Sequence, residues 1–258
     1  MLELDCENYS TSLSSLKTLL QINEDELFNF FYHVDLDKFF DENPFFNGYG
    51  SDAIYKLFSK RPVQTEYWVN WFHLTRVIGF FRHDLGILNL QEALPEIWHG
   101  LYKLVSNKVS CEEWKQYKEH IEYSNNFNAR LYRSKIEKQP SDGPYAVLNP
   151  IVGFIPEKIG YHNYFRTPEI IEDICTTLDE YYDLDLQNTF ERNSKPCIVK
   201  FRKIEKNGKY LKECLYFVYL CFMKKDLGHP VNTCFSGYGV SIRPEEIVDV
   251  KYPNLTKV

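Results

Sequence analysis

The chain has 258 residues, of which 44% are apolar and 26% charged, and this composition excludes a mostly disordered protein. Its net charge of −6 argues against a generally basic surface for nucleic acid, although a local basic groove stays open. The longest apolar run, Cys214–Met223, has about half the length of a membrane span. The N-terminus lacks the basic start and apolar core of a signal peptide. We therefore expect a cytoplasmic protein with no membrane partner.

The seven cysteines are odd in number and widely spaced, and no Cys-x-x-Cys pair occurs. This spacing favours reduced, mostly buried thiols over a disulfide framework or a zinc site. The histidines are scattered as well, so we expect no metal. The sequence lacks a Walker lysine loop, a Gly-x-Gly-x-x-Gly and a His-Glu-x-x-His motif. These absences argue against an ordinary P-loop ATPase, Rossmann dehydrogenase or zincin.

The first 60 residues have the pattern of helices. Four leucines between positions 13 and 20 follow helical spacing, Asn23 is a capping residue for a second helix, and Asp52–Lys60 forms a short third. Residues 1–61 are therefore predicted as an N-terminal helical extension. Seven phenylalanines crowd positions 28–46, more than a solvated arm needs. The extension is expected either to pack on the rest of the chain or to bind a protein partner.

The pattern changes at Glu66–Val77, where both faces are apolar and a buried strand is predicted. Helical spacing over Leu94–Val105 predicts the clearest helix, and Cys111–Phe127 a second one. A short strand is expected at Tyr145–Leu148. Thr167-Pro168-Glu169 then has the form of a helix start, in which the threonine hydroxyl is the cap.

From Cys197 onward the pattern indicates strands. Cys197–Lys203 is expected to pair with Tyr210–Met223 across Lys206-Asn207-Gly208, a hairpin turn. Near the C-terminus, short strands are expected at Val240–Ile242 and Ile247–Tyr252. One helical turn, Arg243–Glu246, lies between them. Helices, one strand, more helices and then strands predict an α+β fold.

A histidine and a hydroxyl stand at the end of the first apolar strand, in Trp71-Phe72-His73-Leu74-Thr75-Arg76, and Leu85-Gly86-Ile87-Leu88 follows the next loop. An imidazole and a hydroxyl offer orienting hydrogen bonds within an apolar slot. The segment resembles the first motif of ADP-ribosyltransferases. That resemblance implies that His73 and Thr75 contact the ribose and the nicotinamide amide of NAD. Arg76 could hold the pyrophosphate bidentately; core packing of His73 and a surface ion pair of Arg76 are the alternatives.

Two further segments fit the same family. Asn163-Tyr164-Phe165-Arg166-Thr167 resembles its second motif, a Tyr-Phe pair before a helix that starts with Ser or Thr. This implies that Tyr164 stacks on nicotinamide and that Thr167 belongs to the NAD site. An electron-rich ring face also suits an oxocarbenium-like transition state. The segment 242–250 looks like the family's closing Ile-x-Pro-Glu-x-Ile-x-x-Val, a turn into the last strand.

The resemblance also implies a catalytic glutamate at the start of a late strand, where a carboxylate stabilises positive charge developing at the sugar carbon. Glu213, which opens the second strand of the predicted hairpin, is the candidate, and an exposed strand residue is the alternative. Glu169 and Glu172 are second choices, because a helix start favours acids in any case. No position matches the family's third motif, and two helices must be inserted between His73 and Tyr164.

Taken with the family, the chain is expected to be an ADP-ribosyltransferase-like split β-sheet domain over residues 62–258, with inserted helices. The implied activity is transfer of ADP-ribose from NAD to a protein or nucleic acid, as in cytosolic toxins and phage-defence effectors. Two alternatives stay open. One is a non-enzymatic, antitoxin-type interaction module that uses the aromatic surface and the acidic N-terminal helices. The other is an RNA 2′-phosphotransferase-like enzyme, which would need Arg76, Arg130 and Arg133 in one cleft.

Overall fold

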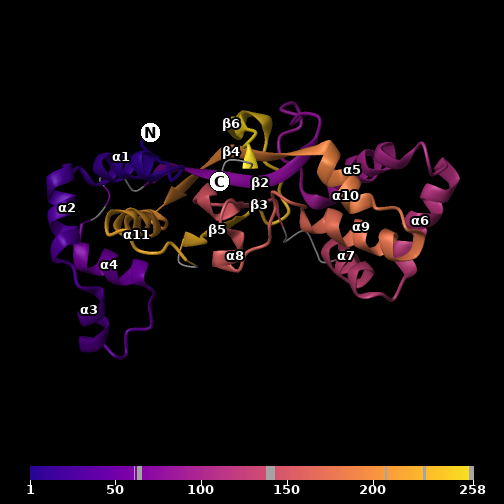
Figure 1. Ribbon diagram of the computed structural model, residues 1–258. Helices are drawn as coiled ribbons and strands as arrows, with labels where there is room; N and C mark the ends of the chain where they lie inside the picture. The colour runs from indigo at the N-terminus through magenta and orange to yellow at the C-terminus, as the bar shows by residue number, and fades with distance from the viewer. Residues whose placement is uncertain (61, 63–65, 138–142, 207, 229–230, 256–258) are drawn as a thin grey trace. The chain divides into compact units, whose positions relative to one another are not determined.

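A computed structural model describes residues 1–60, 62, 66–137, 143–206, 208–228 and 231–255. These residues form a mixed α+β structure with one six-stranded sheet and helices in the connections between its strands (Figure 1). The α+β class predicted from the sequence is confirmed. Within the described ranges, every helix is too short or too polar to cross a membrane.

The N-terminal region is helical, as predicted. Strand β1 (Glu3–Leu4) is followed by four helices, α1 (Tyr9–Leu20), α2 (Glu24–His33), α3 (Leu36–Glu42) and α4 (Gly50–Phe58). Asn23 caps α2, because its side chain accepts a hydrogen bond of 2.8 Å from the backbone N–H of Glu26. That bond satisfies one of the N–H groups that the first turn of a helix leaves without a partner.

Most of the phenylalanine run packs inward. Phe31 is buried, and Phe28 stacks on Phe222 with ring centroids 4.6 Å apart. Phe39 is buried too, and it meets Phe46 edge to face at 5.1 Å. Phe45 differs from these, because it is 96% exposed. Packing therefore accounts for most of this run.

The sheet has the strand order β5-β3-β2-β4-β6, and β1 pairs with β2. Its strands after β1 are β2 (Glu66–Ile78), β3 (Tyr145–Val147), β4 (Ser194–Lys206), β5 (Cys234–Ser236) and β6 (Ile247–Lys251). β1 runs parallel to β2, whereas β2 with β3 and β4 with β6 are antiparallel. Phe72 lies opposite Val147, and Val199 lies opposite Val250. The strands predicted around positions 66, 145, 197 and 247 are all present.

Helices fill the long connections. They are α5 (Leu90–Val105), α6 (Cys111–Tyr123), α7 (Phe127–Glu137), α8 (Pro156–Ile159), α9 (Glu169–Tyr182), α10 (Leu186–Asn193) and the short 3₁₀ turns η1 (Pro150–Gly153) and η3 (Pro244–Glu246). The second predicted helix stops early, at Tyr123, because the Asn126 side chain accepts from the Ala129 N–H at 2.7 Å and begins a new helix. Pro168 occupies the cap position of α9, so the expected cap by Thr167 is wrong.

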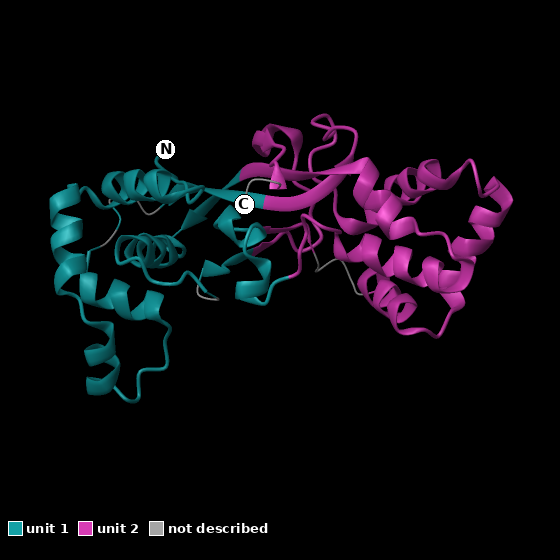
Figure 2. Ribbon diagram, in the orientation of Figure 1, with its two compact units in different colours: residues 1–72, 147–161, 202–234 teal, residues 73–146, 162–201, 235–258 magenta. Residues whose placement is uncertain are grey.

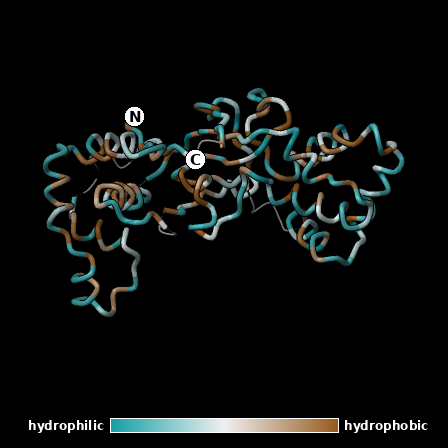
Figure 3. Tube along the Cα trace, in the orientation of Figure 1, coloured by the Kyte–Doolittle hydropathy of each residue, from teal (hydrophilic) through white to brown (hydrophobic). Residues whose placement is uncertain are grey.

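The predicted hairpin after β4 is wrong. Leu211–Phe222 is a helix, α11, rather than a strand, and Asn207 of the expected turn lies outside the described residues. Leu211, Leu215 and Val218 follow helical spacing and are fully buried, and apolar residues also stand between them. A short apolar run of this kind fits a strand and a buried helix equally well. Figure 3 shows how hydrophobic α11 is along its length.

The chain divides into two compact units, which Figure 2 colours separately. Unit 1 comprises Met1–Phe72, Val147–Tyr161 and Arg202–Cys234, and unit 2 comprises His73–Ala146, His162–Phe201 and Phe235–Val258. This division differs from the expected boundary between residues 61 and 62. Helices α1 and α4 pack on α11 within unit 1, so the N-terminal helices form one body with a helix close to the other end of the chain.

Unit 2 has a core of its own, built by α5, α6, α7, α9 and α10. Helix α9 packs against α6, α7 and α10, and its Ile174 and Leu178 are fully buried. Trp98 donates a hydrogen bond from its indole N–H to the Tyr132 hydroxyl at 3.1 Å. The ring of Trp98 also meets Trp114 edge to face at 5.5 Å. Every predicted site residue except Glu213 belongs to the same unit as this core.

Candidate functional site

His73 lies on β2 and is held in one orientation. Its Nδ1 is 2.7 Å from the carbonyl oxygen of Tyr145, the first residue of β3. A carbonyl oxygen can only accept, so Nδ1 carries the proton and the lone pair of the neutral ring lies on Nε2. Burial lowers the pKa of His73 below its ordinary value of 6.5, against the opposing effect of the bond to Tyr145. At neutral pH the strand therefore presents a neutral imidazole with an acceptor nitrogen.

This lowered pKa predicts a specific pH dependence of stability. The unfolded chain takes up a proton on His73 as the pH falls through about 6.5, while the folded chain resists it. The stability that the neutral ring contributes is thus present above that pH and lost below it. Between pH 7 and pH 5, the wild type should lose stability relative to His73→Gln in urea unfolding. A wild type that instead gains relative stability on acidification would mean that the folded protein holds an imidazolium.

Thr75 and Arg76 follow on the same strand and point in opposite directions. Side chains alternate along a strand, so Thr75 shares a face with His73, and Arg76 lies on the other face. The Thr75 hydroxyl makes a long hydrogen bond of 3.5 Å to the Arg76 carbonyl. His73 and Thr75 together form one pair of polar groups on a face of β2 whose flanking residues, Trp71 and Val77, are apolar.

Arg76 is a structural clamp in unit 2. Its Nε donates to the Ser194 hydroxyl at 2.8 Å, and its Nη2 donates to the carbonyls of Glu191 and Ser194, both at 2.7 Å. Its Nη1 donates to the Phe165 carbonyl. The guanidinium thus binds β2 to the end of α10, the start of β4 and the segment before α9. Because these oxygens engage all three of its nitrogens, the expected role as a pyrophosphate ligand has little support.

The second motif lies beside that clamp. The Tyr164 hydroxyl donates to Glu169 at 3.1 Å, and its ring meets His162 edge to face at 4.8 Å. The Thr167 hydroxyl donates to Glu191 Oε1 at 3.0 Å. The structure therefore brings Tyr164 and Thr167 together with Arg76, through the Phe165 carbonyl and α10. Among the residues described, it records no contact between His73 and Tyr164, the two predicted walls of the slot.

Glu191 is a candidate site carboxylate that the sequence analysis did not predict. Besides the Thr167 hydroxyl, its Oε1 accepts from Arg166 Nε at 3.2 Å and from the Gln187 amide at 3.4 Å. Its second carboxylate oxygen has no hydrogen bond to a described residue. Its side chain is 24% exposed. The carboxylate is thus held by one oxygen and open at the other. No motif surrounds position 191, which lies near the end of a short helix.

Glu213, the predicted catalytic residue, is in a different setting from the one expected. It lies in the first turn of α11, not at the start of a strand, and it belongs to unit 1. Burial raises the pKa of its carboxyl, and the charge of Lys212 opposes this. Its Oε2 has no hydrogen-bond partner in the described chain. A carboxyl biased toward its neutral form is a poor stabiliser of a positively charged transition state.

Other candidate residues of the sequence analysis, Glu169, Glu172 and Arg133, also have partners near them. Glu169 lies 3.5 Å from Lys135, and Glu172 lies 3.8 Å from His162. Arg133 donates from Nη1 to the carbonyls at the end of α6, including that of Ser124 at 2.6 Å. Arg76 and Arg133 therefore bind different backbone oxygens, and the convergence required by the phosphotransferase alternative is not observed in the described residues.

No group of three or more His, Cys, Asp and Glu side chains in the described ranges is placed to hold a metal ion. The comparisons with known proteins add no analogy: no family model, no curated protein and no solved structure matches the chain.

Proposed function

We propose that the protein is an NAD-dependent ADP-ribosyltransferase and that unit 2 holds its NAD site. The observation that carries the proposal is the fixed imidazole of His73. With Nδ1 bound to the Tyr145 carbonyl, Nε2 can accept a hydrogen bond from an amide or a sugar hydroxyl of the ligand. The Thr75 hydroxyl on the same face supplies a second polar contact. ADP-ribose would pass to a macromolecular acceptor, a protein or a nucleic acid.

Glu191 is the carboxylate that we assign to this site in place of Glu213. It belongs to the same unit as His73, and its backbone carbonyl binds Arg76 on the opposite face of β2 from that histidine. The hydrogen bonds from Thr167 and Arg166 fix one oxygen, which leaves the other for a ribose hydroxyl. A carboxylate oriented in this way needs little rearrangement to stabilise positive charge on the sugar.

The test is release of free nicotinamide from NAD by the purified protein. We expect His73→Ala and Glu191→Gln each to lower the rate by about 100-fold or more, the usual effect of removing one group that stabilises a transition state. His99→Ala, on the exposed side of α5, and Glu180→Gln, whose carboxylate accepts from Asn126 at 2.9 Å, are the matched controls in unit 2. Both should keep the wild-type rate, as should Glu213→Gln.

The outcomes separate the parts of the proposal. Loss in His73→Ala with a normal rate in Glu191→Gln would keep the NAD site and remove Glu191 from it. The same loss in Glu213→Gln would return the catalytic role to that residue. If the wild type neither binds NAD nor releases nicotinamide, the transferase proposal is wrong.

A non-enzymatic interaction module is the second candidate, and one observation favours it. Phe45, Tyr49 and Tyr32 are 96%, 81% and 73% exposed on the N-terminal helices and their loops. The same region is rich in acids, with Asp25, Asp37 and others on its surface. Exposed rings among carboxylates suit a basic protein partner. Failure of the nicotinamide test would leave this as the better description of the chain.

A further inference from the structure

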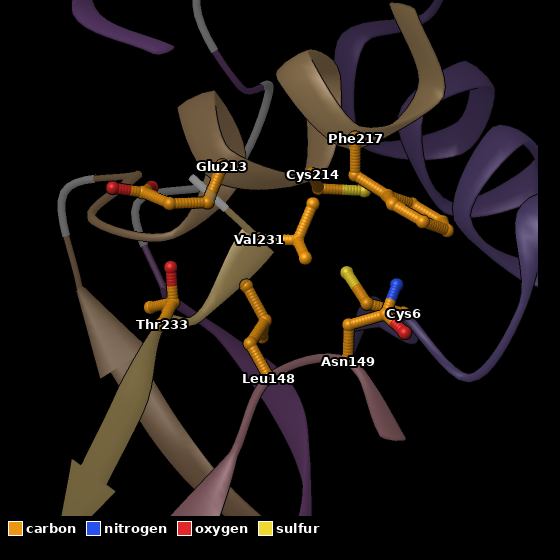
Figure 4. Close-up of a pocket in the computed structure, with 8 residues that line it drawn as sticks. All are labelled: Cys6, Leu148, Asn149, Glu213, Cys214, Phe217, Val231 and Thr233. Atoms are coloured by element: carbon orange, nitrogen blue, oxygen red, sulfur yellow. The ribbon is translucent and has the colours of Figure 1, made fainter. Parts of the chain in front are cut away.

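A small cavity lies in unit 1, apart from the residues assigned to NAD. Its volume is about 10 Å³, room for roughly one water-sized group. Two thiols, an amide and a carboxyl line it, those of Cys6, Cys214, Asn149 and Glu213. In Figure 4 the sulfur atoms of Cys6 and Cys214 point into the same space, and the amide nitrogen of Asn149 lies beside Cys6.

The two cysteines are far apart in the sequence. Cys6 follows β1 and is 1% exposed, and Cys214 lies on α11 and is fully buried. The thiol of Cys214 donates to the Ser12 carbonyl on α1 at 3.7 Å, and both cysteine side chains line the same cavity. Both are free in the structure. Two thiols that face one small cavity are placed for a disulfide to form between them.

Asn149 gives the cavity an unused donor. Its Oδ1 accepts from the Ile151 N–H at 2.9 Å, but its Nδ2 has no partner in the described chain, although the residue is 3% exposed. An N–H group left over in a buried site can stabilise the negative charge of a thiolate. The orphaned donor thus lies where a reacting sulfur needs it.

The surroundings of the pair favour a neutral product. Among the described residues that line the cavity none is a lysine, arginine or histidine, whereas the Glu213 carboxyl is one of the lining groups. Burial raises the pKa of Cys214 well above its ordinary value. A permanently charged dithiolate, as in a metal complex, is therefore disfavoured, whereas a disulfide carries no charge. The same burial makes the reaction slow, because a thiolate must form first.

We propose that Cys6 and Cys214 are an oxidisable pair that forms an intramolecular disulfide with hydrogen peroxide. One thiolate attacks a peroxide oxygen, the O–O bond breaks, and a sulfenic acid and water result. The second thiol attacks that sulfur, the S–O bond breaks, and a second water leaves. In sum, two thiols and one peroxide give one disulfide and two waters. The bond fixes the N-terminal segment to α11.

The experiment starts from the full chain under native conditions. The exposed thiols of Cys111 and Cys234 are first blocked with iodoacetamide, and the protein is then treated with peroxide and digested without reduction. Mass spectrometry should find the peptides of Cys6 and Cys214 joined, with the loss of two hydrogens. The disulfide closes a loop of about 200 residues, so the oxidised protein should melt about 10 °C higher than the reduced one.

Variants make the result specific. Cys6→Ser should show neither the joined peptides nor the rise in melting temperature, whereas Cys175→Ser, which removes a buried thiol of unit 2, should show both. The mass measurement on the wild type does not depend on any variant folding. If both thiols can still be alkylated after unfolding of the peroxide-treated protein, or if they are found as separate sulfinic acids, the proposal is overturned.

Discussion

Gly86→Ala should destabilise the protein by about 3–5 kcal/mol, the combined cost of a left-handed backbone, a steric clash and two broken hydrogen bonds. The glycine has a φ of +69°, and a Cβ there would lie 2.0 Å from the Ile242 carbonyl oxygen. That carbonyl accepts from the Ile87 N–H at 2.9 Å, and the Ile87 carbonyl accepts from Ile242 at 2.8 Å. The substitution must push the two segments apart and break this pair.

Gly79→Ala is the matched control, measured beside it by urea unfolding. Gly79 has a φ of +76°, but nothing lies within 4 Å of the position of its Cβ. The free energy of unfolding of Gly79→Ala should therefore fall by about 1 kcal/mol, the cost of the left-handed backbone alone. Equal losses in the two variants would mean that the close approach of Gly86 to Ile242 does not determine the stability of this region.

Arg76 should be the second position with a large effect. Replacing it with alanine leaves the carbonyls of Phe165, Glu191 and Ser194 without their donor, and we expect a loss of about 3–4 kcal/mol. Arg76→Lys should lose almost as much, because an ammonium group keeps the charge but cannot reach several acceptors in a planar fork. Urea unfolding measures both variants. NAD binding should weaken in proportion to the loss of folded protein.

Arg82→Lys provides the comparison. Arg82 and Asp84 form an exposed ion pair at 2.7 Å, and lysine there should leave stability unchanged within error. If Arg76→Lys is as stable as the wild type but no longer binds NAD, Arg76 acts as a ligand and not as a clamp.

The sequence predicted correctly those helices, strands and caps that depend on residues close together in the chain. The strand at β2, the helix at α5, the Asn23 cap and the turn at η3 each depend on residues a few positions apart, and all are present. Helix α11 was predicted as a strand because its run of ten apolar residues fits both periods. What decides between them is packing against α1 and α4, which lie some 200 and 160 positions away and leave no trace in the run itself.

The site shows the same division. That His73 would lie on a strand beside a hydroxyl could be predicted, because alternation is a local property. The partners of Arg76 could not, since they are 89 to 118 positions away. Glu191 had no signal at all, because its contacts with Thr167 and Arg166 arise from the packing of α9 against α10. Long-range hydrogen bonds show that Arg76, predicted as a ligand, has a structural role. They also show the carboxylate of Glu191, which no sequence motif indicates.

Unit 1 is built from segments that are far apart in the sequence, and this affects the protein while the ribosome makes it. Helices α1 to α4 are complete by Phe58, but α11, on which α1 and α4 pack, begins at Leu211. At about 5–20 residues per second, the ribosome needs roughly 8–30 s to make the stretch between them. Throughout that time the faces of α1 and α4 that pack on α11 lack that partner. These exposed apolar faces are a risk for aggregation of the nascent chain. The risk ends when α11 has been made and covers them.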